Sequence, residues 1–125
     1  MQTPDFSGKT ILIVDDLEDN IFLLTKILEL TNATILKAKS GPASIQMVSE
    51  NPSIDIILMD IKMPGMDGFI ATAEIHKQRP QLPVIAQTAF AMKDDEDKAL
   101  ASGCIEYVSK PISRLDLFEK LAKHL

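Results

Sequence analysis

Apolar residues along this chain gather in five short runs, and the stretches between the runs repeat apolar residues at helical spacing. Runs as continuous as these are typical of strands that are covered on both faces. The intervening stretches begin or end with residues that suit helix ends, such as Pro42 and Gly103. The pattern predicts strands over 9–14, 34–38, 54–59, 83–87 and 104–109, and helices over 17–28, 42–50, 69–79, 92–102 and 114–125.

Five strands that alternate with five helices predict an α/β fold with a parallel, doubly wound sheet. We expect the flavodoxin-like (βα)5 arrangement, with strand order 2-1-3-4-5 and a switch point between the first and third strands. Two helices carry clear apolar stripes, which we expect to face the sheet. These stripes are Leu17, Ile21, Leu24 and Leu28 in the first helix, and Leu115, Phe118, Ala122 and Leu125 in the last.

Polar residues stand where four of the five runs end. Asp15 and Asp16 follow the first run, and Asp60 follows the third. Thr88 and Lys110 follow the fourth and fifth. Because the carboxyl ends of parallel strands share one edge of the sheet, we expect these side chains to meet there.

Three crowded carboxylates repel one another, so either one stays protonated or a cation neutralises them. Oxygen ligands favour Mg²⁺, with Mn²⁺ or Ca²⁺ as alternatives. A carboxylate can also attack phosphorus, and a lysine and a hydroxyl nearby would stabilise the phosphoryl group. Asp60 on its own could equally be a strand-end residue that binds nearby backbone N–H groups.

The set of Asp15, Asp16, Asp60, Thr88 and Lys110, in this order on βα units, resembles the receiver domain of two-component response regulators. The resemblance covers residues 9–125, and it implies that Asp60 accepts a phosphoryl group from a phosphohistidine. The donor would be a histidine kinase or a histidine phosphotransfer protein, and the downstream protein is unknown. The domain would then be no enzyme beyond self-phosphorylation and slow self-dephosphorylation.

The same resemblance assigns further roles. Mg²⁺ would be bound by the three carboxylates and by the backbone carbonyl of Lys62, and Thr88 and Lys110 would contact the phosphoryl group. The Lys110–Pro111 peptide bond would be cis. Thr88 and Tyr107 would form a switch that alters the face made by the fourth helix, fifth strand and fifth helix.

Two segments, TAFAM (88–92) and GCIEYVSKPI (103–112), are similar to receivers attached to hybrid histidine kinases. Lys62 and Phe90 occupy positions that tune the phosphoryl lifetime in this family. We therefore expect both side chains to restrict the water that hydrolyses the phosphorylated residue.

The composition sets outer limits. A formal net charge of −5 argues against direct nucleic-acid binding, and no apolar run is long enough for membrane insertion. One cysteine, Cys104, and no secretory signal indicate a cytoplasmic domain. Residues 1–8 are expected to be a polar tail or the end of a linker, and Asn20 to be a solvated helix-start residue.

Three other functions fit parts of the pattern. A phosphohydrolase of the haloacid-dehalogenase type needs an acid two residues after its nucleophile, where this chain has Lys62. A flavin-binding flavodoxin needs hydroxyls and glycine after the first strand, where this chain has acids. A receiver that has lost its chemistry would act by contact alone, although here every expected site residue is present.

Overall fold

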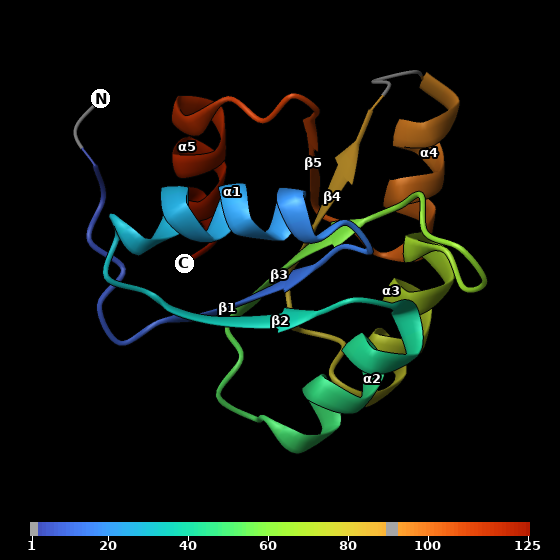
Figure 1. The fold of residues 1–125 in the computed structure, drawn as a ribbon. Helices are drawn as coiled ribbons and strands as arrows, with labels where there is room; N and C mark the ends of the chain where they lie inside the picture. Colours follow the sequence, from blue (N-terminus) through green and yellow to red (C-terminus); the bar gives the residue numbers. More distant parts are fainter. Residues whose placement is uncertain (1–2, 90–92) are drawn as a thin grey trace.

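The computed structural model describes residues 3–89 and 93–125, and for 93–96 it describes the backbone alone. Five parallel strands form one sheet in the order β2-β1-β3-β4-β5, as the sequence predicts (Figure 1). The strands are β1 (Thr10–Val14), β2 (Thr34–Ala38), β3 (Ile56–Asp60), β4 (Val84–Thr88) and β5 (Glu106–Ser109). The helices are α1 (Glu18–Glu29), α2 (Gly41–Glu50), α3 (Gly68–Gln78), α4 (Lys93–Ser102) and α5 (Arg114–His124).

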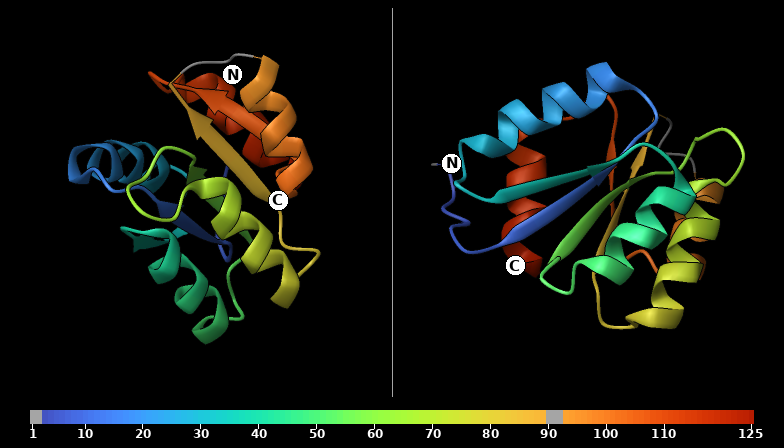
Figure 2. Two further views of the ribbon diagram at one scale, coloured as in Figure 1. Left: turned by 90° about the vertical axis from the view of Figure 1, so that its right-hand side faces the viewer. Right: turned by 60° about the horizontal axis from the view of Figure 1, so that its bottom comes forward.

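Two apolar layers sandwich the sheet (Figure 2). On one face, α1 and α5 pack over the side chains of Ile13, Leu58 and Ile85. On the other face, α2, α3 and α4 pack over Leu12 and Met59. Every residue of β1, β3 and β4 is buried, which explains why these strands are apolar over most of their length and do not alternate between apolar and polar residues.

Element boundaries differ from the prediction by one or two residues, and two of these differences matter for the site. Asp60 and Thr88 are the last residues of β3 and β4, whereas the sequence placed them just beyond the strands. The helix α2 begins at Gly41, one residue before the expected start, because the side chain of Ser40 accepts a hydrogen bond from the N–H of Ala43 at 3.1 Å.

The predicted buried faces of two helices were wrong in part. Leu17 precedes α1 as its N-cap residue and is 58% exposed. In α5, Leu115 is 50% exposed and Ala122 is also exposed. Phe118 is buried against the sheet as predicted, together with Leu117 and Leu121, and Leu125 packs against the same layer.

The expected tail at residues 1–8 is attached to the domain through Phe6. Its side chain is buried in the layer under α1 and α5, and its N–H donates to the carbonyl of Thr31 at 2.7 Å. Over the described residues, no helix combines the length and the apolar character that crossing a membrane requires.

Candidate functional site

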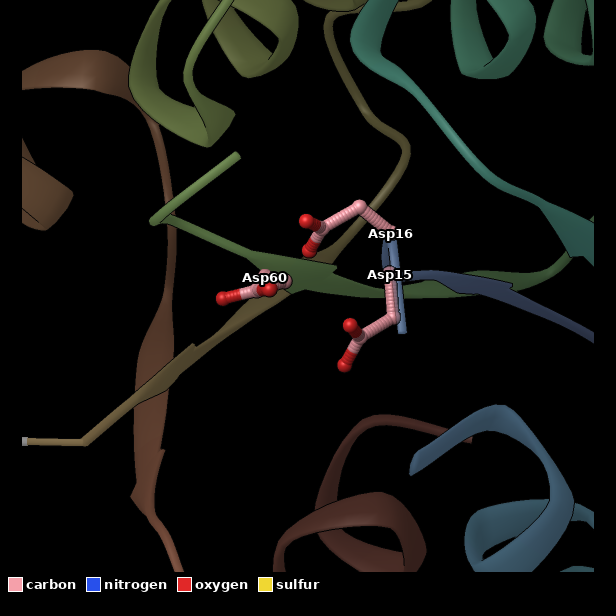
Figure 3. A group of neighbouring side chains, drawn as sticks. All are labelled: Asp15, Asp16 and Asp60. Atoms are coloured by element: carbon pink, nitrogen blue, oxygen red, sulfur yellow. The ribbon is translucent and has the colours of Figure 1, made fainter. Parts of the chain in front are cut away.

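The alternation of side chains along the strands brings the acids to one face of the sheet. Ile13 and Leu58 point toward α1 and α5, so Asp15 and Asp60, two residues further on, point the same way. Asp15 is fully buried, Asp60 is 3% exposed, and one oxygen from each lies within 4.8 Å of an oxygen of Asp16. Figure 3 shows the three carboxyl groups together at the tips of β1 and β3.

Lys110 reaches this cluster from the end of β5. Its Nζ lies 3.4 Å from Oδ2 of Asp15 and 3.5 Å from Oδ1 of Asp60. The N–H of Lys110 donates to the carbonyl of Thr88 at 2.7 Å, and the Lys110–Pro111 peptide bond is cis. The side chain therefore approaches the acids from a backbone that is tied to β4.

Short-range hydrogen bonds hold the carboxylates in place. Oδ1 of Asp15 accepts from the N–H of Leu17 at 3.0 Å, and Oδ2 accepts from Nδ2 of Asn20 at 2.7 Å. Oδ1 of Asp60 accepts from the N–H of Lys62 at 3.1 Å. The prediction that Asn20 is merely solvated was wrong, because its place in the first turn of α1 brings its amide to the acidic cluster.

Gly68 allows the loop after β3 to close tightly under the site. A Cβ at this position would lie 2.3 Å from the carbonyl oxygen of Asp60 and 2.8 Å from the Cα of Ile61. Both of these are backbone atoms, so they could move only with the strand end itself. A side chain at residue 68 would therefore displace the backbone that carries Asp60.

Burial raises the pKa of Asp60 to about 6, from an ordinary value of 3.8. The hydrogen bond from the N–H of Lys62 opposes this rise in the pKa, the charge of Asp15 adds to it, and the charge of Lys110 opposes it. A carboxylate that resists ionisation beside two others is a group that a cation would stabilise. The all-oxygen donor set fits Mg²⁺ or Mn²⁺.

Thr88 and Tyr107 lie on strand positions whose side chains point to the opposite face, toward α4. Thr88 is 3% exposed at the end of β4, and Tyr107 is half-buried. Nζ of Lys120 lies 5.2 Å from the centre of the Tyr107 ring. The side chain of Lys62 is exposed, and Phe90 lies outside the described residues.

The family model of the response regulator receiver domain matches residues 11–122. The chain belongs to this family. The acidic cluster therefore belongs to a receiver domain, which is a module of two-component signalling. This confirms the resemblance inferred from the strand-end residues.

Among curated proteins, the sensor protein GacS of Pseudomonas syringae is 36% identical over 90% of this chain. The match spans 13% of the length of GacS. The polar-differentiation response regulator DivK of Brucella abortus is 35% identical, over 94% of this chain and 96% of DivK. The chain is thus similar both to a stand-alone regulator and to a small part of a sensor protein.

Two solved structures are similar in fold and carry informative partners. The receiver domain of Ssk1, crystallised with the phosphotransfer protein Ypd1 of Saccharomyces cerevisiae, is 26% identical with a TM-score of 0.88, covering 99% of this chain and 91% of that one. CheY of Borrelia burgdorferi, in a complex with CheX, BeF3 and Mg²⁺, is 26% identical with a TM-score of 0.86, covering 92% and 87%.

The strand-end residues expected from the sequence meet at one edge of the sheet. Asp15, Asp16, Asp60 and Lys110 lie together at this edge, and Thr88 is linked to them by its backbone hydrogen bond with Lys110. Asn20 is a site residue that the sequence pattern did not indicate, although its spacing of five residues after Asp15 could have pointed to it.

Proposed function

We propose that Asp60 accepts a phosphoryl group from a phosphohistidine partner within a two-component phosphorelay. The observation that carries this proposal is the buried carboxylate cluster with the Lys110 ammonium 3.5 Å from Oδ1 of Asp60. Asp15, Asp16, Asp60 and the backbone carbonyl of Lys62 would hold Mg²⁺, or Mn²⁺ in its place. When bound, the metal ion would supply positive charge that neutralises the acids and the phosphoryl oxygens.

The reaction joins an oxygen of Asp60 to phosphorus. As the new O–P bond forms, the N–P bond of the phosphohistidine breaks, and the imidazole nitrogen leaves with the electron pair. This attack needs Asp60 ionised, and neutralising the cluster favours that form against the raised pKa of about 6. The rigid end of β3 and the Lys62 N–H hold the attacking carboxylate in a fixed orientation.

Lys110 and Thr88 would stabilise the transferred group. The ammonium of Lys110 already lies beside Asp60, so it needs only a short movement to reach an oxygen on phosphorus. Thr88 ends the neighbouring strand, where its hydroxyl would donate a second hydrogen bond. Lys110 therefore lies beside Asp60 before the reaction, whereas the side chain of Thr88, which points to the α4 face, would have to move toward the phosphoryl group.

The phosphorylated partner would dock on α1, beside the acids. A hollow of about 410 Å³ lies here, lined in part by Leu17, Asn20 and Leu23. Leu17 and Leu23 are 58% and 49% exposed, whereas Asn20 touches Asp15. Exposed apolar side chains beside a reactive group favour a protein donor, and the similar Ssk1 receiver was crystallised with a phosphotransfer protein. Such a partner would place its phosphohistidine at Asp60.

The output would be a change in the face formed by α4, β5 and α5. Thr88 and Tyr107 share the α4 side of the sheet, so movement of Thr88 toward a phosphoryl group would free space that the Tyr107 ring can enter. Leu100 of α4, Ile105 just before β5 and Leu115 of α5 are 56%, 39% and 50% exposed. Two packings of Tyr107 would then present two different surfaces to a downstream protein.

Lys62 and Phe90 are proposed to set how long the phosphoryl group survives. The exposed Lys62 side chain follows Asp60 by two residues, so it can reach anions at the site mouth. It also cannot replace the acid that a dehalogenase-type phosphohydrolase needs, which disfavours steady turnover of phosphomonoesters.

Cys104 is buried and burial raises its pKa, in keeping with a free thiol in the cytoplasm.

The test is incubation with Mg²⁺ and acetyl phosphate, followed by intact-mass measurement. We expect a mass gain of one phosphate in the wild-type chain and none in Asp60→Asn. Asp55→Asn is the matched control, since Asp55 lies just before the other end of β3 and binds the N–H of Thr10. Labelling of Asp60→Asn, or no labelling of the wild type, would contradict the proposal.

A further inference from the structure

Gln87 carries a buried side-chain amide that finds no hydrogen-bond partner among the described residues. The residue is fully buried in β4, one position before Thr88. In the part of the chain that the structure describes, neither its Nε2 nor its Oε1 makes a hydrogen bond. Burying an unpaired amide destabilises the folded state, so such a group calls for an explanation. An apolar residue of similar size would avoid this loss.

The register of the sheet turns this amide toward the acidic cluster. Gln87 is the Cα partner of Asp60 on β3 and of Val108 on β5. Val108, Leu58 and Ile85 all point toward α1 and α5, and Gln87 follows Ile85 by two residues. Gln87 and Asp60 therefore project from paired positions on the same face, about 5 Å apart between strands.

Lys110 must cross the end of β4 to reach the acids. It follows β5, whereas Asp60 ends β3 and Asp15 follows β1, and β4 lies between β5 and β3. Neighbouring strands are about 4.8 Å apart, so the ammonium spans roughly two strand separations. Val108 shares this face, and so does Lys110 two residues later. The path of the lysine thus crosses the end of β4 on the face that carries the Gln87 amide.

The contacts of the Lys110 ammonium leave room for another acceptor. An ammonium has three N–H donors, and the two carboxylates that it meets are 3.4 and 3.5 Å away, which is long for hydrogen bonds. Once positive charge neutralises Asp15 and Asp60, their attraction for Lys110 weakens. A neutral amide oxygen keeps its attraction for the ammonium under that change and carries no charge that would compete for a cation.

We propose that Gln87 is a positioning residue for phosphoryl transfer, whose Oε1 accepts a hydrogen bond from Lys110 when the lysine turns to the phosphoryl group. Its Nε2 then faces Asp60, the register partner, and can donate to the oxygen of Asp60 that does not bear phosphorus. Gln87 takes no part in bond making or breaking. It acts through Lys110, and this inference rests on the proposed phosphorylation of Asp60.

The test compares Gln87→Met with the wild type in acetyl phosphate labelling and in decay of the label. Methionine matches glutamine in length but offers no amide, so we expect labelling to slow about tenfold, the typical effect of losing one hydrogen bond to a charged group. The Mg²⁺ dependence of the urea midpoint should not change, because the carboxylates stay in place. Gln87→Leu, which is smaller, repeats the test if methionine overpacks the site.

Two comparisons separate positioning from a structural effect. Ile85→Val trims the same strand and face two residues away, and it should label at the wild-type rate. In a Lys110→Met background, adding Gln87→Met should cause no further loss of rate. Equal rates for Gln87→Met and the wild type would overturn the inference, as would an equal slowing with and without Lys110. A wild-type chain that is never labelled would instead contradict the proposed function.

Discussion

Replacing Asp60 by asparagine should stabilise the metal-free protein at neutral pH. The pKa of Asp60 rises from 3.8 to about 6 in the folded chain, chiefly because the carboxyl group is buried. At about 1.4 kcal/mol per pKa unit, keeping this group ionised costs ~3 kcal/mol of folding free energy. Asparagine removes the charge while its oxygen can still accept from the N–H of Lys62. The attraction of Lys110 is already included in the raised pKa, so ~3 kcal/mol is the upper limit of the gain. The asparagine amide does not reproduce every contact of the protonated carboxyl group, so we expect roughly 1–3 kcal/mol.

The pH dependence gives this prediction its sign. The folded state binds the proton of Asp60 more tightly than the unfolded state does. The stabilisation that comes from this proton is therefore complete below pH 3.8, and it disappears as the pH rises through about 6. The stability difference between Asp60→Asn and the wild type should be largest above pH 7, about half as large at pH 5, and negligible near pH 3.5.

Urea unfolding in EDTA at pH 5 and pH 7.5 measures both quantities. Asp55→Asn is again the control, since Asp55 is half-buried before the opposite end of β3 and its oxygen bonds the Thr10 N–H. We expect no comparable gain there. If Asp60→Asn were no more stable than the wild type at pH 7.5, or if the gain did not shrink at pH 5, the account of the buried charge would be refuted.

Three further predictions follow from single features of the structure. Gly68→Ala should lower the free energy of unfolding by roughly 3 kcal/mol, measured in urea, because its Cβ meets the backbone of β3; an unchanged midpoint would exclude the clash. Asp16→Asn should lose most of the Mg²⁺-dependent rise in urea midpoint that the wild type shows; an equal rise in both would remove Asp16 from the metal site. Leu23→Glu should slow transfer from a phosphotransfer protein at least tenfold while acetyl phosphate still labels it; equal slowing with both donors would argue against docking on α1.

The buried faces of the helices could not be predicted from the sequence alone. The last helix contains apolar residues that form two overlapping stripes, and the sequence pattern predicts burial of the stripe with Leu115 and Ala122. The structure buries Leu117 and Leu121 instead, together with the shared Phe118. Both stripes have helical spacing, so only the direction from which α5 meets β5 and α1 could decide between them.

Gln87 shows the same limit in a strand. A strand that is covered on both faces has no alternation of apolar and polar residues, so the sequence did not reveal which side chains of β4 point toward α1 and α5. The pairing of Gln87 with Asp60 depends on strand register, which is a property of the assembled sheet. The bond between Asn20 and Asp15 likewise depends on the angle at which α1 leaves β1.

The sequence by itself determined the alternation of strands and helices, the strand order and the acids, threonine and lysine at the strand ends. The elements and the strand-end residues follow from local patterns, because continuous apolar runs and breaking residues mark where each strand stops. The strand order was predicted from the general rule for doubly wound parallel sheets. Tertiary structure alone decided which helix faces are buried, how far Lys110 reaches across β4, and that burial raises the pKa of Asp60. Those properties depend on distances between segments far apart in the chain, and such distances exist only once the layers have packed.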